Sequence, residues 1–153
     1  MTGLTSSLLL QTVLLATGAQ PYEQAYKTME DHDQPLLVLV GADWCPACQT
    51  MKSGTMRQLE RSGKLAGVAY AVVNSDRESS LAQKLMRGGS IPQLVLYAKT
   101  PTGWRRSQLT GGQSERQVEA FIARSASASR GSVETASMPS TSSADAESTS
   151  LSR

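Results

Sequence analysis

The stretch "ADWCPACQT", residues 42–50, contains the only two cysteines of this 153-residue chain. Cys45 and Cys48 are three positions apart; Trp44 directly precedes the first, and Pro46 directly follows it. Both thiols are therefore concentrated at one point of the chain, behind an aromatic residue. The segments on either side of this stretch indicate what such an arrangement is for.

The segments around the cysteines alternate between strand and helix patterns. Residues 35–40, "PLLVLV", form a continuous apolar run that is too short for a helix and is typical of a strand buried on both faces. Residues 49–63 have a helical pattern, in which Ser53 and Gly54 predict a bend. Residues 68–73, "VAYAVV", predict a second buried strand. The cysteines therefore lie where a strand leads into a helix.

The remaining segments extend this unit into one α/β domain. Further patterns are helices over residues 21–33 and 80–89, strands over 93–98 and 104–109 around a turn, and a last helix opened by the capping box of Ser114 and Gln117. The order predicts two parallel crossovers followed by a hairpin. The expected fold is a four-stranded mixed sheet flanked by helices on both faces.

The two ends of the chain differ from this central part in composition. Residues 1–19 contain the apolar run Leu8–Ala16 followed by small residues, and we interpret them as a signal peptide. The alternatives are an uncleaved membrane anchor and a plain hydrophobic N-terminal helix. Residues 125–153 are rich in Ser, Thr and Ala and predict a disordered tail, with a modified or glycosylated stalk as the alternative. The folded domain is therefore expected over residues 20–124, in a protein exported to the periplasm.

Two cysteines at this spacing have three common explanations. A structural zinc site needs about four ligands, but the chain has a single histidine, His32, and no second Cys-X-X-Cys. A static disulfide would close a very small ring, which stabilises a fold little. A redox-active pair is the usual meaning of Cys-X-X-Cys beside a strand–helix–strand unit, and we favour it here.

The position of the pair favours thiolate chemistry at the first cysteine. Cys45 is expected at the N-terminus of a helix, where free N–H groups and the helix dipole stabilise a thiolate. Pro46 then occupies the first helical position, where its missing N–H is no disadvantage. We therefore expect Cys45 to be the more exposed and more acidic thiol, and Cys48 to be the buried one.

Three segments together resemble the thioredoxin family. "ADWCPACQ" is similar to the family's Trp-Cys-X-X-Cys motif, "GGSIPQLVLY" to its Ile-cis-Pro loop and following strand, and "GGQSERQVEAFI" to its closing glycine and helix. The early helix running into "QPLLVLVGADWCPACQ" resembles the exported members, including the C-terminal domain of the bacterial transmembrane thiol:disulfide interchange protein. The resemblance implies a thioredoxin fold and thiol:disulfide oxidoreductase activity, with reduction slightly favoured because Ile91 precedes Pro92.

The resemblance also implies roles for the residues around the cysteines. Cys45 would attack a substrate disulfide, and Cys48 would resolve the mixed disulfide that results. Trp44 would flank the site and shield one side of it; the alternative is a core aromatic. Pro46, between the two cysteines, would influence the redox potential.

The site that the resemblance implies is completed by three further residues, which come later in the chain. Ile91 and Pro92 would form a cis peptide opposite the cysteines, whose backbone pairs with an extended substrate segment. The alternative for Pro92 is an ordinary trans turn proline. Gly111 would let the backbone pass close to the site, or would be a simple turn glycine.

The sequence departs from the family in its internal acid. Reductive thioredoxins carry a buried Asp six residues before the first cysteine and a Lys on the next strand, where this chain has Leu39 and Val72. Asp43 could assist only from the surface. Pro46 also replaces the glycine that thioredoxins commonly have after the first cysteine. These differences leave the direction of electron flow open.

A binding module of the same fold, without redox turnover, is the alternative function. It would hold Cu(I) on two thiolates or act as a chaperone, but Met51, Met56 and Met86 lie on apolar helical faces and are better explained as core residues. We expect no cofactor, no metal and, at a net charge of +2, no nucleic acid partner. The expected partners are protein disulfides or dithiols and a redox donor, with the protein acting as a monomer.

Overall fold

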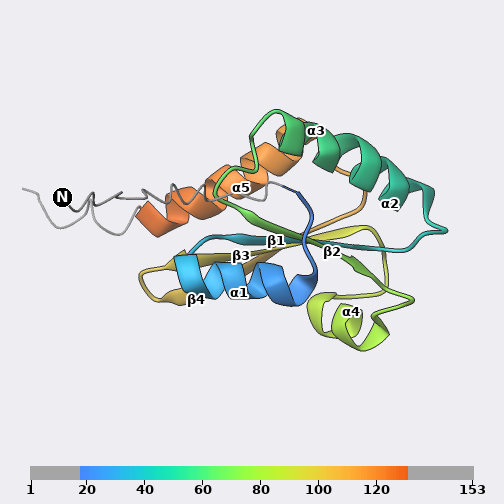
Figure 1. Cartoon of the computed structure of the whole chain (residues 1–153), viewed down its shortest axis with the longest axis horizontal. Helices are drawn as coiled ribbons and strands as arrows, with labels where there is room; N and C mark the ends of the chain where they lie inside the picture. Colours follow the sequence, from blue (N-terminus) through green and yellow to red (C-terminus); the bar gives the residue numbers. More distant parts are fainter. Residues whose placement is uncertain (1–17, 131–153) are drawn as a thin grey trace, which may run out of the picture.

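The computed structural model describes residues 18–130, and Figure 1 shows them as a central sheet with helices on both sides. The elements follow one another in this order: α1 (Tyr22–His32), β1 (Leu36–Gly41), α2 (Pro46–Thr50), η1 (Met51–Met56), α3 (Arg57–Arg61), β2 (Ala69–Asn74), α4 (Ser79–Leu85), β3 (Gln93–Thr100), β4 (Gly103–Thr110) and α5 (Glu115–Arg130). Each helix and strand predicted from the sequence is present.

The sheet has the strand order β2-β1-β3-β4, with β1 and β2 parallel and β3 antiparallel to β1 and β4. The four-stranded mixed sheet is confirmed, but the second predicted parallel crossover is wrong. Helix α4 has 7 residues, about 10 Å at 1.5 Å per residue, whereas the six-residue strand β1 is about 20 Å long. So short a helix does not carry the chain back to the start of the sheet. Strand β3 therefore begins with Gln93 beside Val40 and runs backwards along β1.

The side chains of β1 alternate between two apolar layers. Leu36, Val38 and Val40 pack with α1 and α4, and Leu37 and Leu39 pack with η1, α3 and α5. Figure 1 shows these helices on opposite sides of the sheet. Strand β1 is buried along its whole length, which explains its continuous apolar sequence.

The helical stretch after the cysteines changes its hydrogen-bond pattern at the predicted position. The π-helical segment η1 includes Ser53 and Gly54 and separates α2 from α3. Ser53 Oγ donates to the Gln49 carbonyl at 2.6 Å, a contact that disturbs regular helical bonding. Wide turns of this type occur mostly as short insertions in α-helices, often at functional sites. The regular α-helix is therefore interrupted at Ser53 and Gly54 by a change of helix type, and the bend predicted there stays a prediction.

Helix α5 begins at the predicted capping box. The Gln117 N–H donates to Ser114 Oγ at 3.4 Å, and the Ser114 N–H donates to Gln117 Oε1 at 2.8 Å. These bonds satisfy backbone groups that the first turn of a helix leaves without partners. Val118 and Phe121 are buried and fix the helix to the sheet.

Helix α5 also extends past the predicted end of the domain. It continues to Arg130, so the expected boundary at Arg124 and the disorder predicted from Ser125 are wrong for this stretch. Alanine is the best helix former, and the packed first turns of α5 supply the nucleus from which a helix propagates. The predicted signal peptide, up to residue 17, and the tail from residue 131 lie outside the described residues.

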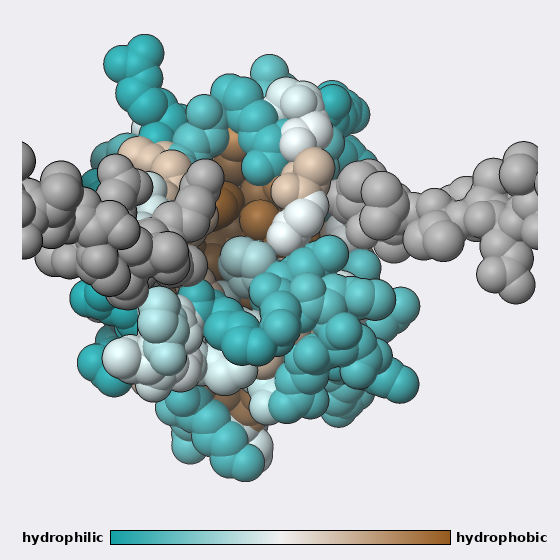
Figure 2. Space-filling view, turned by 90° about the vertical axis from the view of Figure 1, so that its left-hand side faces the viewer, coloured by the Kyte–Doolittle hydropathy of each residue, from teal (hydrophilic) through white to brown (hydrophobic). Residues whose placement is uncertain are grey.

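The face of the domain that Figure 2 shows is mainly hydrophilic. Figure 2 shows the end away from α2, where hydrophilic residues surround a hollow with hydrophobic residues at its floor. Within residues 18–130, the helices are all too short or too polar to cross a membrane.

Candidate redox-active site

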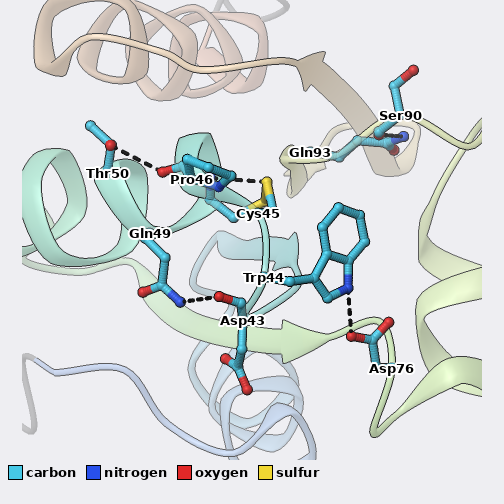
Figure 3. Close-up of a disulfide and its surroundings, with 10 residues drawn as sticks. Asp43, Trp44, Cys45, Pro46, Gln49, Thr50, Asp76, Ser90 and Gln93 are labelled. Atoms are coloured by element: carbon cyan, nitrogen blue, oxygen red, sulfur yellow. Dashed lines mark hydrogen bonds between the residues drawn. A yellow bond between two sulfur atoms is a disulfide. The ribbon is translucent and has the colours of Figure 1, made fainter.

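Cys45 and Cys48 form a disulfide at the start of the helical stretch that follows β1 (Figure 3). Their Cα atoms are 5.2 Å apart. Cys45 is the N-cap of α2, with an extended backbone at φ −89° and ψ 110°, and Pro46 begins the helix. The Cys48 N–H donates a hydrogen bond of 3.2 Å to Cys45 Sγ. A helix N–H therefore points at the sulfur of the first cysteine, where it would stabilise a thiolate in the dithiol form.

Gly41, the last residue of β1, lets the second cysteine pack against the strand. A β-carbon on Gly41 would lie 2.9 Å from Cys48 Cβ and 3.0 Å from Cys48 Sγ. The Gly41 carbonyl also accepts from the Ser75 N–H at 2.8 Å, which joins the site to the loop after β2. We did not predict a role for Gly41, although a glycine in a strand is a signal of close approach.

Trp44 lies on the surface beside the disulfide. Its side chain is 70% exposed, and Nε1 donates to Asp76 Oδ2 at 2.9 Å (Figure 3). Asn74 Oδ1 accepts from the backbone N–H groups of Asp76 and Arg77 at 2.9 and 3.2 Å, which orders the loop that carries Asp76. Trp44 is therefore not a core aromatic, and a distant segment of the chain sets the direction of its ring.

Asp43 is paired with a cation. Its Oδ2 lies 2.5 Å from Arg77 Nη2, and both side chains are more than half exposed. The Gln49 side chain donates to the Asp43 carbonyl at 2.8 Å. Because exposed ion pairs contribute little to stability, these contacts mainly order the loop between β1 and α2.

The loop before β3 packs against the disulfide. The peptide bond between Ile91 and Pro92 is cis, and the Ile91 side chain packs against Ala42, Cys45 and Cys48. Within residues 18–130, no hydrogen bond involves the Ile91 backbone. Its N–H and C=O groups are therefore free to pair with an incoming chain.

Gly111 contacts this loop, but the need for glycine at this position differs from the expected one. Its N–H donates to the Pro92 carbonyl at 2.8 Å, and its φ is 87°, a region that favours glycine. A β-carbon at this position would meet no atom within 4 Å. Backbone conformation therefore requires the glycine, and close packing does not.

The two cysteines are equally buried in the disulfide form. Each is 5% exposed, so the expectation that Cys45 is the more exposed thiol is wrong for this form. Ala42 belongs to the same apolar cluster as the two cysteines, and Ile91 packs against that cluster.

A small cavity adjoins Cys48 where the internal acid is missing. Its volume is about 30 Å³, and Leu39 and Val72 contribute apolar walls, while Asp43, Gln49 and Lys52 contribute exposed polar side chains. A cavity of this size holds water only where polar groups can bind it. Leu39 is 1% exposed, so the side next to the strand offers no proton acceptor to Cys48.

Three methionines of the described residues, considered above as copper ligands, are explained by packing. Met51 and Met56 are buried in the apolar layer with α5, and Met86 packs against the opposite layer, as predicted. Within residues 18–130, no three His, Cys, Asp or Glu side chains are grouped closely enough to hold a metal ion.

The sequence pattern of the thioredoxin-like family matches residues 18–99, which include both cysteines and the cis Ile91–Pro92 bond. The chain belongs to the thioredoxin-like family. Three solved thioredoxins are similar in fold to this thioredoxin-like protein. They are those of Thermus thermophilus (TM-score 0.55, 21% identity, covering 68% of this chain and 82% of that one), Halobacterium salinarum NRC-1, as a mutant (0.53, 24%, 70% and 87%), and Fasciola hepatica (0.52, 19%, 67% and 91%). No curated protein is significantly similar in sequence.

The thioredoxin-like protein therefore combines a thioredoxin fold with a Cys-X-X-Cys pair at disulfide distance. This arrangement is consistent with thiol–disulfide exchange. Among its contacts, Asp76 and Gln93 were not predicted from the sequence. For Gln93 the sequence did offer a signal, because it is a lone polar residue between the apolar residues Pro92 and Leu94.

Proposed function

We propose that this protein is an exported thiol:disulfide oxidoreductase that reduces disulfides in protein substrates. The Cys45–Cys48 disulfide carries the proposal, because it lies at a helix N-terminus between an exposed Trp44 and the Ile91–Pro92 loop. The sulfur that would attack is next to Ile91, whose backbone makes no hydrogen bond within residues 18–130.

The reaction transfers two electrons from the dithiol to the substrate. The Cys45 thiolate attacks one sulfur of the substrate disulfide, which forms a mixed disulfide and releases the other substrate sulfur as a thiolate. Cys48 then loses its proton and attacks Cys45 Sγ, which breaks the mixed disulfide and releases the second substrate sulfur. The released thiolates take protons from Cys48 and from solvent. A dithiol donor must afterwards reduce the Cys45–Cys48 disulfide.

Substrate recognition through the Ile91 backbone fits this reaction. An extended substrate segment would accept from and donate to the free Ile91 groups, as in strand addition. Because such bonds involve only the main chain, this contact alone does not select a particular substrate sequence. The exposed face of Trp44 would cover the other side of the segment.

A disulfide reductase assay tests the proposal. Insulin reduction, with dithiothreitol as the electron donor, is measured for the wild type, Cys45→Ser and Cys48→Ser. We expect turnover above the rate of dithiothreitol alone, lost in both variants. Bound Cu(I) without turnover would support the binding module, and would overturn the proposal.

Alkylation of the reduced protein tests the separate roles of the thiols. The Cys48 N–H at Cys45 Sγ predicts that iodoacetamide modifies Cys45 first, with a pKa below the ~8.5 of a free thiol. Prior modification of Cys48 would reverse the assigned roles.

We further propose that the protein works as a monomer in the periplasm, like the exported thioredoxin-like domains that it resembles. The apolar run Leu8–Ala16 supports export, and an oxidising compartment supplies disulfides. One chain contributes both cysteines and the Ile91–Pro92 loop, which supports the monomer. Fractionation of a Gram-negative host that expresses the full chain with a C-terminal tag tests the location, and recovery only from the cytoplasm would contradict it.

A further inference from the structure

We propose that Gln93 is a positioning residue, whose side chain holds the Arg87–Pro92 loop in the conformation that presents the Ile91 backbone to substrate. The inference rests on the proposed function. Gln93 follows the cis peptide bond directly, as the first residue of β3. It is 0% exposed and is the one buried residue with a charged or amide side chain in the part of the chain that the structure describes.

The Gln93 amide uses all of its hydrogen-bonding capacity. Nε2 donates to the Ser90 carbonyl at 2.7 Å and to the Arg87 carbonyl at 3.1 Å. Oε1 accepts from the Arg87 N–H at 3.1 Å and from Gln108 Nε2 at 2.8 Å. A side-chain amide offers two donor hydrogens and two acceptor lone pairs, so none is left over. Figure 3 shows Gln93 and Ser90 close together, beside the disulfide.

The loop has few other polar contacts that could hold it, although the Ile91 side chain packs against the disulfide. Within residues 18–130, no bond between backbone groups involves residues 87–91. Gly88 and Gly89 have no side chains to pack and are exposed. Apart from Gln93, the Gln108 amide also reaches the Arg87 carbonyl, at 3.4 Å. Gln93 therefore supplies most of the polar contacts that fix this segment.

The Gln93 amide is itself held in place by polar residues of β4. Gln108 lies opposite Val95 in the register of β3 and β4, so it projects from the same face of the sheet as Gln93. Arg106 donates to Gln108 Oε1 at 2.8 Å and also to the Leu85 carbonyl at the end of α4. A rotation of the Gln93 amide would break its bonds both to the loop and to Gln108, so the amide is restricted to one orientation.

Loss of these bonds should affect substrate binding more than chemistry at sulfur. Without them, the Ile91 backbone would have to be ordered when a protein substrate binds, which weakens binding. A small reductant that attacks the disulfide directly does not use the Ile91 backbone. The two classes of reaction partner should therefore respond differently to a change at Gln93.

The test compares Gln93→Met, which keeps the length of the side chain but loses the amide, with Gln24→Met on the exposed face of α1 as the control. For Gln93→Met we expect KM for insulin to rise about tenfold, while kcat and the rate of disulfide reduction by dithiothreitol change less than about twofold. The ¹⁵N order parameters of residues 88–91 should fall to those of a flexible backbone, below about 0.6. Gln24→Met should match the wild type throughout.

Several results would overturn the inference. Unchanged order parameters in Gln93→Met would show that the amide does not hold the loop, and equal losses with insulin and dithiothreitol would show a general structural effect. If the wild type does not reduce insulin, the proposed function fails, and the order parameters alone decide whether Gln93 holds the loop. If Gln93→Met does not fold, Gln108→Met removes one of the four bonds, and an unchanged KM with unchanged order parameters in that variant overturns the inference.

Discussion

On the side of the strand, Cys48 lies among residues that give it space but no proton acceptor; Asp43, which lines the same cavity, is exposed and paired with Arg77. Gly41 has no β-carbon to compete with the cysteine side chain, and Leu39 and Val72 provide apolar walls. An apolar environment disfavours the thiolate and raises the pKa of a thiol. The single residues around Cys48 therefore influence both the packing of the disulfide and the rate at which mixed disulfides are resolved.

Substitution of Gly41 by alanine should be strongly destabilising. The new β-carbon would lie 2.9 Å from Cys48 Cβ, closer than carbon atoms pack. We expect the free energy of unfolding to fall by about 1–3 kcal/mol, measured by denaturant titration. Gly54→Ala is the matched control, because a β-carbon there would meet no atom within 4 Å, and in a helical segment it should stabilise by about 0.5–1 kcal/mol. Equal effects of the two substitutions would contradict the close contact at Gly41.

Introduction of an acid at Leu39 should speed reductive turnover. An Asp side chain beside the cavity could accept the Cys48 proton, whereas the wild type must lose that proton to water or substrate. We expect faster insulin reduction by Leu39→Asp than by Leu39→Asn, which has the same size but no acid, across about pH 6 to 9. Both variants should unfold more easily, by about 2–4 kcal/mol, because each loses a buried leucine and places a polar group on a buried strand. A folded Leu39→Asp protein that is no faster than Leu39→Asn would show that the missing acid does not limit turnover.

At the scale of helices and strands, the elements themselves can be predicted from local sequence patterns. The pairing and direction of the strands in the sheet cannot. Continuous apolar runs predicted β1 and β2, and the Ser114–Gln117 spacing predicted the start of α5. The direction of β3 depends on the short length of α4, which ends at Leu85, whereas the residue pattern predicted a helix over residues 80–89. The cysteine motif was recognisable because its members are adjacent. Asp76 was not, because its contact with Trp44 joins residues 32 positions apart and depends on the fold.

The capping box of α5 should make a measurable contribution to stability. Ser114→Ala removes the Oγ that accepts from the Gln117 N–H, and we expect the free energy of unfolding to fall by about 1 kcal/mol. Ser80→Ala in α4 is the control, since alanine is the better residue inside a helix and should be neutral or slightly stabilising. Urea unfolding monitored by circular dichroism measures both. A Ser114→Ala protein as stable as Ser80→Ala would show that this cap contributes little.

At the scale of the whole molecule, the sheet separates two apolar layers, one between each of its faces and the helices that cover it. Tyr70 of β2 belongs to the layer with α5 and is 3% exposed. Within the described residues its hydroxyl has no hydrogen-bond partner. Burial, and to a smaller extent the nearby Glu60 carboxylate, raises the pKa of Tyr70 above its ordinary value of 10.0.

The raised pKa of Tyr70 predicts a loss of stability in alkali. Below about pH 10 the tyrosine is neutral in both the folded and the unfolded chain, and above it only the unfolded chain ionises, so the free energy of unfolding falls as pH rises. Tyr70→Phe cannot ionise and should lose less stability there. At pH 7 it should also be about 1 kcal/mol more stable, because it removes an unpartnered buried hydroxyl. Thermal unfolding of both proteins from about pH 7 to 11 measures this, and parallel curves would contradict it.

The order of the strands also bears on how the molecule behaves in concentrated solution. Gln20 pairs with Ala71 and covers part of the β2 edge, whereas β4, in the described residues, pairs only with β3. An uncovered edge is a template on which copies of a protein can aggregate. Arg105 and Arg106 are adjacent on β4 and project to opposite faces of the sheet. A second copy approaching this edge would bring its own arginines towards them, so the positive charge disfavours aggregation at the strand where the sheet is most open.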